Sequence, residues 1–153
     1  MANTYSQISI HCVFAVKGRE NIIIQNFRDD LHKYMSGVLK NDDVFPLAVG
    51  GWKDHIHVFF ELLPNLKISD IIRNLKSVSS KWINDNHFVL GKFQWQDGYG
   101  AFSYSRSQRN NVIKYIINQE EHHRTKTFRE EYLEMLKKFE VEFKDEYVFD
   151  FYE

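Results

Sequence analysis

The sequence predicts an α+β protein with the element order strand, helix, strand, strand, helix, strand, followed by further helices. Two segments space their apolar residues as helices do, and four short segments show strand-like patterns bounded by turn residues. This βαββαβ order is that of the ferredoxin-like fold, which RRM domains share. We therefore expect one antiparallel sheet with helices on one face and its other face free for a ligand or partner.

The first half of the chain contains three expected strands and one helix. The first strand falls within residues 4–16, where apolar side chains such as Ile10 and Cys12 occupy alternate positions. A helix is expected over about 26–40, because apolar residues recur there at helical spacing. Residues 44–52 and 55–62 are expected to form an antiparallel hairpin with a short connection.

The second half contains the remaining helices and one strand. The second helix of the βαββαβ unit is expected over about 69–85, with its apolar and polar residues on opposite sides. A strand follows within 98–105. A helix is then expected to begin near Ser107 and run to about His123, and a last helix to span about 128–139.

Length and composition indicate one domain. The chain has 153 residues, 43% of them hydrophobic, which is enough for a core. We expect residues 1–153 to form a single domain in which about 129–153 are an acidic C-terminal helix and tail.

The one cysteine, Cys12, has no intrachain partner, which suits a reducing compartment. With no signal-peptide pattern and no apolar run long enough for a bilayer, we expect a cytoplasmic protein without membrane contact.

The charge distribution is uneven along the chain. The net charge of −1 does not favour nucleic-acid binding. However, the C-terminal 25 residues contain nine of the 21 acidic residues and only four of the 20 basic ones, so the rest of the chain is mildly basic. A DNA strand requires only a local positive groove. Charge alone is also compatible with an ordinary protein surface.

Two histidines separated by one residue are the sharpest local feature, in the segment Asp54-His55-Ile56-His57. Side chains alternate along a strand, so His55 and His57 point to one face with Cα atoms about 7 Å apart. Two imidazoles placed in this way can bind one divalent metal ion. The pair is equally compatible with two exposed strand histidines, because a metal site needs further ligands.

A tyrosine and a glutamine four residues apart form the second feature. Tyr115 and Gln119 are expected one turn apart on the same side of a helix, with His122 and His123 near that side. Taken by itself, the helix favours a simpler interpretation. Tyr115 is then a boundary residue that packs its ring and leaves its hydroxyl in water.

Together the two features suggest a site for phosphodiester chemistry. A tyrosine hydroxyl, with an ordinary pKa of about 10, is a weak nucleophile at neutral pH. A metal ion beside it could polarise a phosphodiester and stabilise the charge that develops on the phosphate oxygens. Gln119 offers an amide oxygen as a third, neutral ligand. This donor set favours Mg²⁺ or Mn²⁺ over structural zinc.

At these residues the sequence resembles the single-tyrosine members of the HUH nuclease superfamily, the small transposases of insertion sequences that move as single strands. A lone His-x-His is weak evidence, but four stretches occur in the family's order and span most of the chain. They are Asp54 to His57, Leu75 to Ser80, Trp95 to Ser103, and Tyr115 to His123.

The resemblance implies a role for each matched residue. His55 and His57 match the metal-binding histidines, Tyr115 matches the nucleophile, and Gln119 matches a third metal ligand. It also implies single-stranded DNA as the substrate, with hairpins at the element ends. A homodimer is implied too, in which the tyrosine helix of one subunit can complete the site of the other.

The implied reaction is a strand transfer. Tyr115 would attack the scissile phosphate, form a 5′-phosphotyrosine and release a 3′-OH, which then reseals another linkage. Six basic residues are candidates for contacts with the DNA backbone: Arg73, Lys76, Lys81, Arg106, Arg109 and Lys114. Three aromatic residues could stack bases, although each is also a plausible core residue: Trp52, Trp95 and Tyr99.

Three alternative functions remain open. The chain could be a non-catalytic module that binds single-stranded nucleic acid on its sheet. It could be a small metal-dependent hydrolase with a different substrate. It could also be a domesticated relative that processes chromosomal repeats with the same chemistry.

Overall fold

A computed structural model describes residues 4–19, 21–123 and 125–144. The end of the expected acidic tail, residues 145–153, lies outside these ranges. The helices and strands are β1 (Ser9–Ala15), η1 (Lys17–Arg19), α1 (Gln25–Asn41), β2 (Phe45–Gly51), β3 (His55–Glu61), α2 (Ile68–Asp85), β4 (Gly100–Tyr104), η2 (Arg106–Gln108), α3 (Arg109–Ile117), α4 (Gln119–His122) and α5 (Phe128–Lys138).

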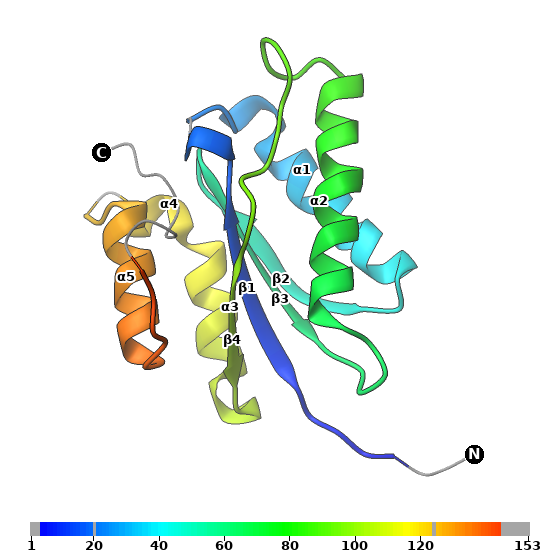
Figure 1. Cartoon of the computed structure of the whole chain (residues 1–153), viewed down its shortest axis with the longest axis vertical. Coiled ribbons are helices and arrows are strands. Elements are labelled where there is room, and N and C mark those ends of the chain that lie inside the picture. Colours follow the sequence, from blue (N-terminus) through cyan, green and yellow to red (C-terminus); the bar gives the residue numbers. More distant parts are fainter. Residues whose placement is uncertain (1–3, 20, 124, 145–153) are drawn as a thin grey trace.

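The four strands form one sheet in the order β2-β3-β1-β4, and every neighbouring pair is antiparallel. This arrangement confirms the α+β, ferredoxin-like fold that the element order predicts. The sheet lies between two groups of helices, with α1 and α2 on one side and α3, α4 and α5 on the other (Figure 1). None of the helices in the described ranges has the length and hydropathy of a membrane-crossing segment.

The face toward α1 and α2 contains the larger core. Cys12 and Phe14 of β1, together with Ile56 and Val58 of β3, are fully buried there against both helices. The strands present these residues on one face because side chains alternate in direction along a strand. Their intervening neighbours, which include His55 and His57, therefore point to the other face.

The expectation that this other face is free is wrong. Val112 and Ile116 of α3 cover the β2–β3 side of it, where they pack on Phe59. Helix α5 packs on Val13 and Phe102 nearer β4. The sheet is itself apolar at these positions, so covering it removes hydrocarbon from water. As a result, the two histidines are buried beneath the C-terminal helices.

The expected single helix over 107–123 is also wrong, because the structure divides it into η2, α3 and α4. The last division falls at Asn118, whose φ of −92° and ψ of 28° are not helical. Asparagine is a poor residue for a helix interior, since its side chain competes for backbone hydrogen bonds. Beyond the break the chain turns Gln119 inward, so that only 1% of this residue is exposed.

Candidate metal and tyrosine site

His55 and His57 lie at the start of β3, on the face toward α3 and α5, and both are fully buried. Their ring centroids are 5.0 Å apart. The period-two spacing of the sequence predicts this common face, and the structure confirms it. The exposed pair that the sequence left open is therefore excluded.

The Nδ1 atom of each histidine is engaged by a different neighbour. His55 Nδ1 lies 2.7 Å from Oδ1 of Asp54, and His57 Nδ1 lies 2.8 Å from Nε2 of His11. His11, on β1, is itself fully buried and stacks on the His57 ring. Such contacts fix the orientation of an imidazole and leave its Nε2 atom for a ligand. Both Nε2 atoms face the same point.

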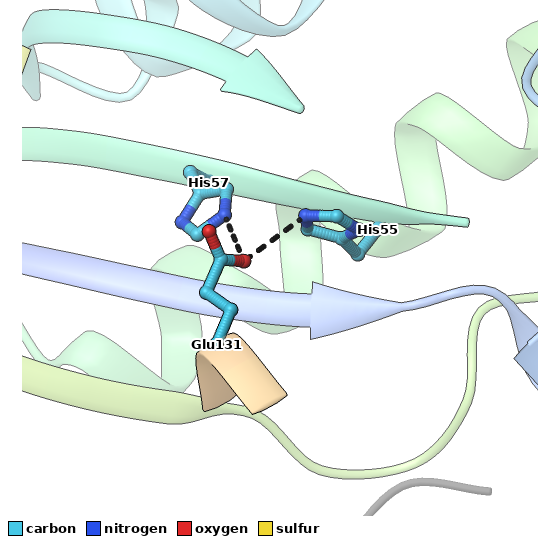
Figure 2. A group of neighbouring side chains, drawn as sticks. All are labelled: His55, His57 and Glu131. Carbon is cyan, nitrogen blue, oxygen red and sulfur yellow. Dashed lines mark hydrogen bonds and ion pairs between the residues drawn. The ribbon is translucent and has the colours of Figure 1, made fainter. Parts of the chain in front are cut away.

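A carboxylate that the sequence does not distinguish from its many other acids also faces this point. Glu131 of α5 reaches in between the two rings and is 2% exposed (Figure 2). Its Oε1 lies 3.2 Å from His57 Nε2 and 3.4 Å from His55 Nε2. The ligand atoms of the three residues all lie within 4.8 Å of one another, so the cluster could hold one metal ion.

The spacing of these donors suits an octahedral cation. Two adjacent ligands of Mg²⁺, each at about 2.1 Å from the ion, are about 3 Å apart. The separations between the two histidines and Glu131 are close to this value. Gln119 adds a fourth donor, because its Oε1 lies 3.0 Å from His55 Nε2. The residues present therefore fit a divalent cation with mixed nitrogen and oxygen ligands.

Tyr115 lies at the edge of this cluster within the same chain. Its hydroxyl donates a hydrogen bond to Oε2 of Glu131, whereas Oε1 is the oxygen that contacts His55 and His57. Its ring centroid is 5.7 Å from that of His57 and 4.9 Å from that of His122. The structure thus brings together all four residues that the resemblance selects: His55, His57, Tyr115 and Gln119.

The charges of the cluster are set by burial and by mutual contacts. Burial lowers the pKa of His55, but hydrogen bonds to Asp54 and Glu131 outweigh it and raise the pKa to about 9. Burial also opposes ionisation of Glu131, yet the surrounding histidines hold its pKa well below the ordinary value. For Tyr115, burial and then the negative charge of Glu131 raise the pKa above its ordinary value. The phenol is therefore protonated and donates to a carboxylate.

A cleft between α3 and α5 gives access to Tyr115. It encloses about 360 Å³, and both Tyr115 and Glu131 contribute to its wall. The remaining wall combines apolar surface with polar side chains, among them Gln108, Asn111, Lys126 and Lys138. A charged strand could thus approach the hydroxyl without entering the apolar core.

Three of the expected DNA contacts line a groove on the other side of the molecule. Arg73, Lys76 and Lys81 project from α2 into this groove, which encloses about 850 Å³, and Lys17 and Lys92 add to its positive charge. Two of the α2 cations form exposed ion pairs, Arg73 with a carboxylate at 2.9 Å and Lys81 with one at 2.6 Å. Lys76 instead donates to two backbone carbonyls of the segment that follows Trp95.

The other three expected contacts belong to η2 and α3. Arg106 and Lys114 are exposed, whereas Arg109 is half-buried and pairs with Glu61 at 2.6 Å. The six cations therefore do not form one surface. Trp95 is a core residue with 8% exposure, and its indole donates to Ser79, so it does not serve as a stacking platform in this structure.

The fold and the cluster define the class first: an antiparallel α+β protein with a candidate His-His-Glu metal centre beside a tyrosine hydroxyl. Comparison with known proteins then identifies the family. Residues 4–119 match the sequence profile of the family described as "Transposase IS200 like". The match covers well over half of the chain, so the protein belongs to the IS200-like transposase family, whose members are DNA transposases.

Individual relatives agree with this assignment. The chain is 21% identical over 118 residues to the ISDra2 transposase TnpA of Deinococcus radiodurans, a match covering 74% of this chain and 84% of that protein. A crystal structure described as a transposase of D. radiodurans R1 superposes with a TM-score of 0.60 at 20% identity, covering 78% and 96% of the two chains. A REP-associated tyrosine transposase bound to a REP hairpin gives 0.59 at 13% identity, covering 80% and 73%.

Proposed function

We propose that the protein cuts and rejoins single-stranded DNA through a covalent bond between Tyr115 and a 5′-phosphate, and so excises and inserts an insertion sequence. One observation carries the proposal. In a chain of the IS200-like transposase family, the Tyr115 hydroxyl is hydrogen-bonded to the carboxylate that lies between His55 and His57.

We propose that His55, His57 and Gln119 hold a divalent cation, Mg²⁺ or Mn²⁺. When bound, such an ion polarises the scissile phosphate and offsets the negative charge that develops on its oxygens. The protein's own residues orient the reaction. Asp54 and His11 fix the two imidazole rings, and α3 places the phenol beside them.

The proposed reaction consists of two balanced exchanges at phosphorus. The phenolic oxygen of Tyr115 gives up its proton and bonds to the phosphorus, the bond from phosphorus to the 3′ oxygen breaks, and that oxygen takes up one proton and leaves as a hydroxyl. In the second step a 3′-hydroxyl of another strand attacks the phosphotyrosine, and the phenol is regenerated. One phosphodiester replaces another, so no nucleotide cofactor is required.

We propose that DNA occupies both recesses of the molecule. The strand to be cut enters the cleft between α3 and α5, whose wall includes Tyr115, while Arg106, Arg109 and Lys114 lie on the elements beside it. The groove along α2 suits the backbone of a duplex because several cations line it. A hairpin at an element end is the ligand we assign to this groove. The REP-associated relative, which is bound to a hairpin, supports that assignment.

We further propose the biological setting that the resemblance implies. The whole chain, residues 1–153, acts as one domain, as a homodimer, in the cytoplasm where its DNA substrate lies. A domesticated relative that processes chromosomal repeats would use the same site and the same chemistry.

Tyr115→Phe tests the nucleophile. The variant should keep the fold and the binding of a labelled single-stranded element end, because only one hydroxyl is lost. It should form no covalent protein–DNA complex with Mn²⁺ on a denaturing gel, whereas wild type should. Tyr34→Phe, which removes a hydroxyl from α1 on the opposite side of the sheet, is the matched control and should behave as wild type.

The same assay separates the alternatives. An adduct that persists in Tyr115→Phe would remove this residue from the mechanism. Wild-type protein that binds DNA without any adduct would be a binding module. Release of free cleaved product without an adduct at any time would indicate a hydrolase.

The positive groove along α2 leads to a separate prediction about DNA binding. Arg73→Ala and Lys81→Ala should each weaken binding of a hairpin and reduce the slope of log K against log salt by about one unit. Their present ion pairs are exposed and stabilise the fold little, so DNA phosphates can replace them. Lys33→Ala, an exposed change on α1, is the control. An unchanged slope in both groove variants would place the hairpin elsewhere.

A further inference from the structure

The carboxylate at the centre of the site comes from a part of the chain that the family profile does not match. The profile ends at residue 119, whereas Glu131 lies on α5. The donors that the matched segment brings to the site are the imidazoles of His55 and His57 and the amide of Gln119. All three are neutral when they bind a metal. A site built from these donors alone would have no anionic protein ligand.

We propose that Glu131 is an additional metal ligand, supplied by α5, which gives the site its only negative protein donor among the described residues. This inference rests on the proposed function and deepens it. Mg²⁺ and Mn²⁺ prefer oxygen ligands, carboxylates above all. Glu131 Oε1 lies almost equally far from the Nε2 atoms of His55 and His57, at 3.4 and 3.2 Å.

The two oxygens of this carboxylate face different partners. Oε1 lies toward the two histidines, and Oε2 accepts hydrogen bonds from the Tyr115 hydroxyl and, at 3.1 Å, from Nε2 of Gln119. One side chain therefore connects the proposed metal position with the nucleophile. Metal ligation through Oε1 leaves the contact between Oε2 and Tyr115 intact, so the phenol stays next to the bound ion.

Helix α5 is anchored firmly enough to serve this role. Its N-terminus is capped by Thr127, whose side chain accepts a hydrogen bond from the backbone N–H of Glu130. Phe128 is 3% exposed and stacks on the His55 ring at a centroid distance of 3.9 Å. Farther along the helix, Met135 and Leu136 are buried against the sheet. The position of Glu131 is thus set by packing on both sides of it.

Metal binding by the full-length protein tests the inference without reference to DNA cleavage. Mn²⁺ affinity would be measured by isothermal titration calorimetry for wild type, Glu131→Gln and His55→Ala. Glu131→Gln keeps the size of the side chain and removes its charge. We expect it to weaken Mn²⁺ binding at least tenfold, because even partners of metal ligands contribute this much. His55→Ala should abolish binding.

Glu134→Gln is the matched control. It removes the same charge from the same helix, but at an exposed carboxylate that pairs with Lys126. Its Mn²⁺ affinity should equal that of wild type. Circular dichroism and thermal unfolding in chelator would show that each variant is folded before titration. Affinity within twofold of wild type in Glu131→Gln, with loss in His55→Ala, would overturn the inference.

Anomalous scattering from wild-type crystals soaked in Mn²⁺ gives an answer that requires no variant. The peak should lie at bonding distance, about 2.2 Å, from Glu131 Oε1. A peak bonded to His55 and His57 but not to Glu131 would equally overturn the inference. Either failure leaves the proposed strand transfer intact if wild type still forms its Tyr115 adduct. Conversely, absence of that adduct would leave a Glu131-dependent metal site standing.

Discussion

His55 and His57 differ in the residue that contacts Nδ1, the ring nitrogen on the side away from the proposed metal position. Asp54, a carboxylate, lies against Nδ1 of His55, whereas a second imidazole, His11, lies against Nδ1 of His57. If His57 binds a metal through Nε2, its Nδ1 carries the hydrogen and donates to Nε2 of His11. His11 then carries its own hydrogen on Nδ1, a buried atom without a hydrogen-bond partner in the described structure. An unpaired buried group of this kind is costly, which is consistent with a functional role for His11.

We predict that His11→Ala lowers Mn²⁺ affinity by about 10- to 100-fold, because the His57 ring loses its orienting contact. His11→Gln should recover most of the loss, since a glutamine oxygen can accept the hydrogen bond from His57 Nδ1. Titration calorimetry measures both, and His87→Ala, an exposed histidine change, is the control. Equal affinities for wild type and His11→Ala would show that His11 has no part in the site.

The residues of the site were predictable to different degrees for physical reasons. His55 and His57 could be predicted because side chains alternate along any strand, whatever the rest of the fold. Tyr115 and Gln119 were found through motif spacing, although the helix break at Asn118 alters how they approach each other. Glu131 carries no such signal. It is one acid among many in an acidic segment, and only the packing of α5 selects it.

Helix α3, which carries Tyr115, is positioned by a close contact with β2. A Cβ atom at Gly50 would lie 2.4 Å from the backbone oxygen of Ile116 and 2.9 Å from its Cγ2. Only glycine therefore lets α3 approach the sheet this closely. Because Ile116 follows Tyr115 directly, the absence of a side chain on β2 helps to place the nucleophile.

We predict that Gly50→Ala lowers the free energy of unfolding by about 1–3 kcal/mol, because α3 must move away from β2. The same shift should slow formation of the Tyr115 adduct. Urea denaturation and a denaturing-gel time course measure the two effects.

At Gly37, within α1, an added Cβ meets nothing within 4 Å. Gly37→Ala should therefore stabilise the fold by about 0.5–1 kcal/mol and leave the adduct rate unchanged. Similar effects in both variants would contradict this account of Gly50.

The architecture of the whole molecule was predictable only in part. The order of elements follows from local periodicity, and the helix over 69–85 and the hairpin strands lie within one or two residues of their expected bounds. The covering of the second sheet face was missed. An apolar stripe on a C-terminal helix shows that the helix packs, but not against which surface. That choice depends on residues far away in sequence, such as Val13 and Phe102.

The helices that cover the second sheet face bear on which subunit of a dimer supplies the tyrosine to each site. The resemblance implies a dimer in which the tyrosine of one subunit can complete the site of the other. In the structure, however, the Tyr115 hydroxyl is hydrogen-bonded to the carboxylate of Glu131, which contacts His55 and His57 of the same chain. The candidate residues of the site therefore lie together within one chain, and α5 packs over them. We therefore infer that the tyrosine acts with the histidines of its own chain.

Mixing two inactive variants tests this arrangement. His55→Ala retains the tyrosine and Tyr115→Phe retains the histidines, so neither chain alone has a complete site. If each chain must supply both, the mixture forms no covalent complex with a labelled single-stranded element end. If tyrosines are exchanged, mixed dimers have one intact site, and the adduct should reach about a quarter of the wild-type yield. A size tag on the His55→Ala chain shows which subunit carries the DNA. An adduct on that chain would contradict the single-subunit site. Because subunits can exchange slowly, the control compares variants that are mixed before an incubation at low protein concentration with variants that are mixed after it.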